Sequence, residues 1–244
     1  MKNIFLKVSK KFSRSIDNLS IKMPLYIREC PICKWKGSRF KTNWHKLKTR
    51  YDSTCPKCCS KERDRLIYVL LKDFIKSDWI VYHAAPEGSL TKWIQKSSKE
   101  YISGDIIPGY AMEIQDLRDL TFEDNKFDLI WASHVLEHIK EDNLALSEIY
   151  RVLKPNGYVV LQVPTWGENT IEEIPGMDKK DREKLFFQSD HVRLYGKNDF
   201  INLIKKHGFN TRVLSNENLS IEENLKYSLN YLTTNYVFIG QKKK

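Results

Sequence analysis

Short apolar runs alternate with amphipathic segments along most of the chain. Residues 127–133 read Phe-Asp-Leu-Ile-Trp-Ala-Ser, a run of bulky side chains typical of a strand buried on both faces. Apolar residues then recur at helical spacing over residues 135–153. We expect a helix there, capped by Ser133 and ended by the Pro-Asn-Gly of residues 155–157.

The same alternation predicts the other elements of the body. Strands are expected at residues 79–84, 101–104, 110–114, 158–163, 211–214 and 236–240, and helices at residues 90–96 and 199–207. Strands that alternate with helices indicate an α/β fold with a doubly wound, mostly parallel sheet, here of seven strands. Polar side chains that follow such strands face the crevice where these sheets bind ligands.

All five cysteines lie between residues 30 and 59. Cys30 and Cys33 form one C-x-x-C pair, Cys55 and Cys58 form another, and Cys59 follows as a bystander. Two such pairs about twenty residues apart are the ligand set of a structural zinc ribbon, because each tight turn presents two thiolates to one ion. Disulfides are the competing explanation. A secretory signal is not apparent, so we favour zinc and a cytoplasmic location.

The positive charge is concentrated at the front of the chain. The net charge is +10, yet residues 1–60 alone carry 15 Lys and Arg against three acidic residues. Aromatic side chains stand among these basic residues: Trp35, Phe40, Trp44 and Tyr51. They either form the small core of a zinc ribbon or bind nucleic acid.

Five segments are predicted. They are a basic amphipathic helix (1–25), the zinc-ribbon-like module (26–60), a connecting helix capped by Ser60 (61–78), the α/β domain (79–244), and an insertion within it that covers the crevice (165–191). The first helix either packs on the body or contacts a membrane surface. The chain has no apolar run of the roughly 20 residues that a membrane span requires.

The order of motifs in the body resembles the class I S-adenosylmethionine-dependent methyltransferases, which have a Rossmann-like fold. The resemblance rests on Asp105, on residues 116–128 (Asp-Leu-Arg-Asp-Leu-Thr-Phe onward), on the His-Val-Leu-Glu-His of residues 134–138, and on the Arg-Val-Leu-Lys-Pro-Asn-Gly of residues 151–157. It implies that Asp105 binds the ribose hydroxyls and that Asp116, with the Leu117 backbone, binds adenine. The full cofactor set that it implies is Ala85, Glu87, Gly88, Asp105, Asp116, Leu117, Ser133 and His134.

One motif departs from that family. The first strand usually ends in a glycine-rich loop, whereas residues 83–88 read His-Ala-Ala-Pro-Glu-Gly. Ala85 is small enough to allow close approach of a cofactor, and Glu87 could receive its α-ammonium group. The resemblance extends to bacterial methyltransferases with a cysteine-rich front end and this Ala-Pro-Glu turn.

Histidines and a glutamate form the candidate catalytic set. His134, Glu137 and His138 fall on one face of the predicted helix, and His191 precedes Arg193 and Tyr195 in Asp-His-Val-Arg-Leu-Tyr. The set is similar to that of small-RNA 2′-O-methyltransferases, which implies a second divalent ion on Glu137, His138 and His191. Without metal, His191 or His134 would be a general base while Arg193 and Tyr195 orient the acceptor. A purely structural role is the third interpretation.

These expectations favour a methyltransferase that acts on a hydroxyl of a sugar, glycan or other small metabolite. An RNA methyltransferase that docks RNA on the basic module is the second hypothesis. The third is a non-catalytic scaffold whose altered first loop no longer binds the cofactor.

Overall fold

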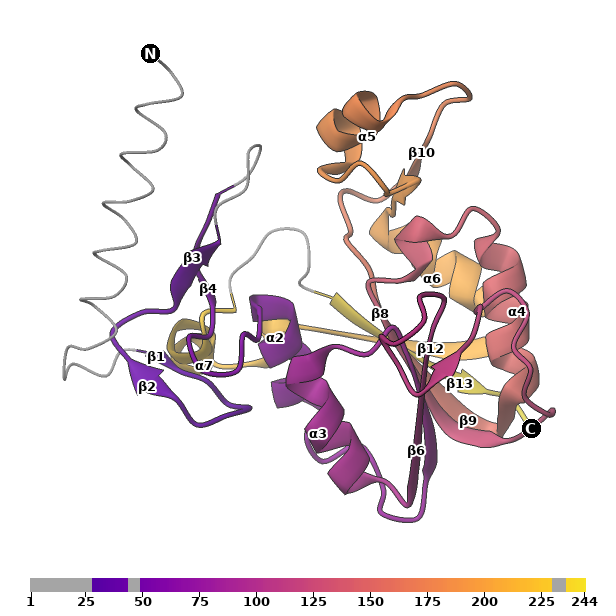
Figure 1. The fold of residues 1–244 in the computed structure, drawn as a ribbon, viewed down its shortest axis with the longest axis horizontal. Helices are drawn as coiled ribbons and strands as arrows, with labels where there is room; N and C mark the ends of the chain where they lie inside the picture. Colours follow the sequence, from indigo (N-terminus) through magenta and orange to yellow (C-terminus); the bar gives the residue numbers. More distant parts are fainter. Residues whose placement is uncertain (1–27, 44–48, 230–235) are drawn as a thin grey trace.

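The computed structural model describes residues 28–43, 49–229 and 236–244 of the chain. The helix predicted over residues 1–25 and the aromatic Trp44 lie outside the described residues. Figure 1 shows a cysteine-rich module (residues 28–60) beside an α/β body, with helix α2 (Glu62–Leu71) between them.

The body is built on a seven-stranded sheet with the strand order β12-β13-β9-β8-β5-β6-β7. Its strands are β5 (Ile80–Ala84), β6 (Glu100–Asp105), β7 (Glu113–Ile114), β8 (Phe127–Ser133), β9 (Leu153–Gln162), β12 (Phe209–Ser215) and β13 (Tyr236–Lys242). β13 is antiparallel to both of its neighbours, and the other pairs are parallel. The predicted doubly wound α/β fold is confirmed.

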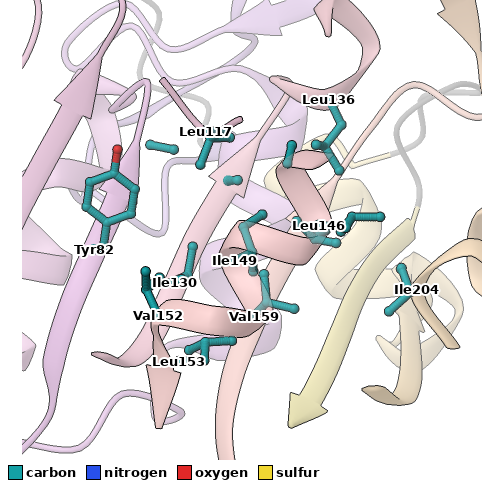
Figure 2. Close-up of a cluster of buried hydrophobic side chains, with 14 of the residues drawn as sticks. Tyr82, Leu117, Ile130, Leu136, Leu146, Ile149, Val152, Leu153, Val159 and Ile204 are labelled. Carbon is teal, nitrogen blue, oxygen red and sulfur yellow. The ribbon is translucent and has the colours of Figure 1, made fainter. Parts of the chain in front are cut away.

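Helices cover both faces of this sheet. The helices after α2 are α3 (Gly88–Ser97), α4 (Asp142–Val152), α5 (Lys179–Phe186), α6 (Lys197–Lys206) and α7 (Ile221–Tyr227), with 3₁₀ turns η1 (Leu136–His138) and η2 (Asn216–Asn218). Of these, α5 lies apart from the sheet and α7 lies beside the module (Figure 1). Successive residues of a strand point to opposite faces. Tyr82 and Ile130 therefore pack with Ile149 of α4 in one core, as Figure 2 shows, while Val81 and Trp131 pack under α2 and α3 in the other.

The helix expected directly after β8 begins later than predicted. Ser133 does not cap it. The Ser133 hydroxyl instead donates to Gln162 Oε1 in the neighbouring strand, 3.3 Å away. His134 has a left-handed backbone (φ 57°), which ends the strand and prevents a helix from starting there. The 3₁₀ turn η1 follows, and α4 begins only at Asp142.

Other boundaries also differ from the predictions. α2 ends at Leu71 rather than near residue 78, and its first turn is capped by Asp64, which accepts from Lys61 N, and not by Ser60. β9 begins at Leu153, so residues 155–157 lie within a strand instead of ending a helix. The strand expected over residues 110–114 is only the two-residue β7.

The cysteine-rich module consists of two short antiparallel pairs. β1 (Arg28–Glu29) pairs with β2 (Lys36–Gly37), and β3 (Lys41–Asn43) pairs with β4 (Arg50–Thr54). Helix α7 comes from the segment 215–229, for which the sequence predicted no element, and packs against β1. The chain thus returns to the module after completing most of the sheet.

Within the described ranges, no helix combines the length and the apolar character needed to cross a bilayer.

Candidate active site

A cavity of about 600 Å³ opens at the carboxyl ends of β5, β6 and β8. Six of the predicted site residues line it: Ala85, Asp105, Asp116, Leu117, His134 and His138. Glu87, Gly88, Ser133, Glu137, His191, Arg193 and Tyr195 are not among the lining residues. The cavity lies where the strand order reverses between β5 and β8, which is where open α/β sheets bind ligands.

Asp105 and Asp116, the two acids predicted to bind the cofactor, differ in the contacts that their carboxylates already make. One Asp105 oxygen accepts from the Ile107 backbone N–H at 2.8 Å, which fixes the carboxylate at the end of β6. Asp116 is held by the guanidinium of Arg118, which lowers the pKa of the Asp116 carboxyl. Arg118 also reaches Glu141 across the cavity mouth at 2.9 Å. A ligand amine at Asp116 would therefore share that carboxylate with Arg118.

Several lining residues were missed in the sequence. Ile106 and Ile107 follow Asp105, line the cavity and are 67% and 50% exposed, so they offer a ligand an apolar surface. Tyr82 lines the cavity from β5. Gly104 makes room for it, because a Cβ at this position would lie 2.3 Å from the Tyr82 hydroxyl oxygen. The Asp-Ile-Ile sequence after a strand was the available signal.

The loop after β5 adopts a left-handed conformation that would favour glycine, although alanine stands there. Ala85 has φ 45°, in the left-handed region, and its N–H donates to Gly104 O at 2.8 Å. Glu87 does not enter the cavity. One of its oxygens lies 2.7 Å from Nε2 of the buried His83, on the α3 side of the sheet. Gly88 is the first residue of α3.

His134, Glu137 and His191 come together despite the wrong helix boundary. His134 Nδ1 shares a hydrogen bond with Glu137 Oε1 at 3.0 Å, and His191 Nε2 lies 4.0 Å from the same oxygen. Burial raises the pKa of Glu137 to about 8, lowers that of His191 to about 4, and lowers that of His134 well below its usual value. Glu137 Oε2 and His191 Nε2 have no hydrogen-bond partner among the described residues.

His138 connects this buried cluster with the cavity. Its ring stacks edge-on against His191 at 4.7 Å, and its Nδ1 lies 3.4 Å from Asp190. One ligand atom each from Glu137, His138 and His191 lies within 4.8 Å of the others. Two imidazoles and a carboxylate form a donor set that fits a divalent transition metal.

Arg193 and Tyr195 hold the turn that carries this cluster. Arg193 donates to the Lys140 and Ile139 carbonyls, at 2.9 and 2.5 Å, and pairs with Glu172. The Tyr195 hydroxyl donates to Asp142 at 2.8 Å. Both side chains are buried. Their contacts position η1, and their predicted contact with an acceptor stays a prediction.

The four cysteines of the C-x-x-C pairs converge in the front module. Cys30 Sγ is 3.6 Å from Cys58 Sγ, and Cys33 Sγ is 3.5 Å from Cys55 Sγ. Thiolates around a tetrahedral zinc ion, with bonds of about 2.3 Å, stand about 3.8 Å apart. All four cysteines are free thiols, and Cys59 is exposed outside the cluster. The donor set and spacing therefore fit zinc.

Several known proteins with similar sequence or fold are described as methyltransferases. Residues 84–161 match the family model described as a methyltransferase domain. A demethylmenaquinone methyltransferase of Streptomyces avermitilis is 39% identical over 62 residues, which cover 24% of this chain and 27% of that protein. A ubiquinone/menaquinone biosynthesis C-methyltransferase of Brucella canis is 30% identical over 105 residues, which cover 37% and 39%.

Solved structures share the fold of the body. A SAM-dependent methyltransferase from Archaeoglobus fulgidus has a TM-score of 0.53 at 14% identity, and the match covers 76% of this chain and 96% of that one. The body therefore has the Rossmann-like fold of the S-adenosylmethionine-dependent methyltransferases, with a methyltransferase domain matched at residues 84–161. The chain spans less than half the length of the curated relatives just described.

Proposed function

We propose that this protein is an S-adenosylmethionine-dependent methyltransferase. The observation that carries the proposal is the cavity at the reversal of strand order, whose lining includes the fixed Asp105 as well as His134 and His138. A carboxylate at the end of the second parallel strand can accept both hydroxyls of a ribose. The exposed Ile106 and Ile107 offer an apolar surface for the base.

For the acceptor we propose a hydroxyl of a sugar, glycan or other small metabolite. Methyl transfer from a sulfonium needs mainly approach and alignment, because the donor is already activated. The His134–Glu137–His191 cluster stands beside the cavity and offers nitrogen atoms that can hold a hydroxyl or take its proton.

We propose two metal sites of different kinds. The Cys30, Cys33, Cys55 and Cys58 thiolates would hold a structural zinc ion. Glu137, His138 and His191 would hold a second divalent ion, whose chemistry is to lower the pKa of an acceptor hydroxyl. The unpartnered Glu137 Oε2 and His191 Nε2 support this second site.

Two successive measurements test the proposed function. Calorimetry with S-adenosylhomocysteine should show binding to the intact chain; no heat at high concentration would favour the non-catalytic scaffold. Transfer of a labelled methyl group is then measured to nucleotide sugars and glycans, to a demethylated quinone, and to heterogeneous RNA. Labelling of the sugar pool alone supports the proposed acceptor.

The other pools test the competing acceptors. A quinone product would indicate the C-methylation that the name of the Brucella canis relative describes. The +12 charge of residues 1–60 favours RNA as the second candidate. RNA labelling that falls steeply with salt, and is lost with Lys34, Lys36 and Lys57 changed to Gln, would establish that alternative.

A further inference from the structure

We propose that Arg63 and Asp64 of α2, together with Glu87 of the loop after β5, bind the amino-acid end of the cofactor. This end is an α-amino acid zwitterion, with one carboxylate and one ammonium group. The inference rests on the proposed function and extends it to α2, which lies outside the matched residues 84–161.

Three polar atoms of these side chains are buried without a hydrogen-bond partner: Arg63 Nε, Asp64 Oδ1 and Glu87 Oε1. Buried polar groups in folded proteins are almost always paired, so three on adjoining elements indicate a ligand. One is a donor and two are acceptors. A carboxylate would satisfy the guanidinium, and an ammonium group would satisfy the two carboxylates.

Each of the two acids has one oxygen held by hydrogen bonds and one without a hydrogen-bond partner. Asp64 Oδ2 accepts from Ser89 Oγ at 2.8 Å and from Lys61 N at 3.0 Å. Glu87 Oε2 is held by His83 at 2.7 Å. The orientation of both acids is therefore set before any ligand arrives. Arg63 Nε and Asp64 Oδ1 form an ion pair at 3.5 Å, which is longer than a hydrogen bond, so each atom can still take a ligand as its hydrogen-bond partner.

The three groups lie directly beyond the cavity. The Asp64–Ser89 hydrogen bond places the first turn of α2 against the first turn of α3, and Figure 1 shows these helices side by side. The loop between β5 and α3 carries both Ala85, which lines the cavity, and Glu87. A ligand whose adenosine part lies near Asp105 and Ala85 can thus extend its tail between β5 and α2.

Electrostatic effects agree with this placement. Burial raises the pKa of Asp64, the positive charge of Arg63 lowers it, and the negative charge of Glu87 raises it again. Two acids close together in a buried place are stabilised by cations, and an ammonium group would add a second cation to the guanidinium.

Two positions of the loop offer no backbone donor to a carboxylate. Pro86 has no N–H, and the Ala85 N–H is already donated to Gly104 O. The Arg63 guanidinium is the side-chain donor that we place there.

Calorimetry with two ligands tests the inference on the full chain. S-adenosylhomocysteine carries the amino-acid end, and 5′-methylthioadenosine has the same adenosine and thioether without it. Arg63→Gln should weaken S-adenosylhomocysteine binding about 10- to 100-fold and change 5′-methylthioadenosine binding less than about twofold. Glu87→Gln should act in the same direction. Lys72→Gln removes an exposed charge just after the same helix and is the matched control.

The outcomes separate this inference from the proposed function. If the unaltered chain binds neither ligand, the proposed cofactor itself is wrong. If it binds both but Arg63→Gln leaves S-adenosylhomocysteine affinity unchanged, the inference is overturned and the function stands. An equal loss for both ligands also overturns it, because the effect would then not be confined to the amino-acid end.

Discussion

The cysteine-rich module and the sheet body are stabilised in different ways. The buried apolar centre of the module consists of Cys30, Phe40 and Cys55, whereas the body has a large cluster of buried side chains on each face of its sheet. A centre this small cannot offset the conformational entropy of its segment without an added cross-link. The body therefore folds on apolar burial, whereas we expect the module to depend on a metal ion held by its thiolates and on buried polar contacts.

Arg65 is the main contact between these two regions. It is fully buried and donates to the carbonyls of Ser53 and Ser60 in the module and of Tyr227 and Ser228 at the end of α7. Its guanidinium lies over the Phe40 ring at 4.0 Å. Beside it, Arg50 and Ser53 of β4 bind Glu62 at the start of α2. The helix that bears the proposed cofactor ligands is therefore anchored to the module.

Removal of metal should produce the largest difference between the regions. A structural zinc ion contributes on the order of 10 kcal/mol to the folding of small modules. A strong chelator should abolish amide exchange protection in residues 28–60 and leave it in β5 and β8. Cys30→Ser should act like the chelator, whereas Cys59→Ser should have no effect. Unchanged protection after chelation would contradict the zinc site.

Replacement of Arg65 should have the next largest effect on stability. Arg65→Met would leave four carbonyl groups without their donor, and we expect a loss of about 3–5 kcal/mol in the free energy of unfolding. Urea denaturation measures it. Lys72→Met, an exposed site after the same helix, should cost less than about 0.5 kcal/mol. Equal urea midpoints for both variants would show that the Arg65 contacts between module and body contribute little to stability.

The crevice histidines should affect activity and not cofactor binding. His138→Ala combined with His191→Ala should lower methyl transfer about 10²- to 10⁴-fold, while S-adenosylhomocysteine binding is retained. Metal analysis should find one ion fewer than in the unaltered chain. His207→Ala, at the C-cap of α6, is the control. A single zinc ion per chain in both proteins would exclude the second site and leave the general-base role.

The cofactor acids should show a smaller effect. Asp105→Ala and Asp116→Ala should each weaken S-adenosylhomocysteine binding by about 1–3 kcal/mol, because a ligand hydroxyl or amine loses its acceptor. The Asp105 effect should be the larger, since Asp116 is already paired with Arg118. Glu123→Ala, at an exposed acid, is the comparison. Unchanged affinity in both variants would reject their assigned roles.

The smallest effect is expected at the loop after β5. Ala85→Gly should raise the free energy of unfolding by up to about 1 kcal/mol, because glycine adopts the left-handed conformation without strain. Ala84→Gly, in the extended strand β5, should lower it by about 1 kcal/mol. A loss of stability from Ala85→Gly would show that the loop is not strained.

The sequence predicted the order of strands and helices and several lining residues of the cavity. Buried strands such as β8 must be apolar along their whole length, and residues that follow parallel strands must meet at one edge, so Asp105 and His134 could be placed from local pattern alone. The wrong helix start after Ser133 had a tertiary cause, because the His134 N–H donates to Gln162 O at 2.6 Å in the neighbouring strand.

What local pattern cannot determine is which distant side chains become neighbours. Arg65 binds carbonyls more than 160 positions away, and Asp64 accepts a hydrogen bond from Ser89, two residues after Glu87. In the sequence these residues belong to an ordinary charged first turn of a helix. The packing of α2 between module and sheet excludes water from these side chains. Arg63 Nε, Asp64 Oδ1 and Glu87 Oε1 are then buried without a hydrogen-bond partner, which is the observation that suggests a ligand.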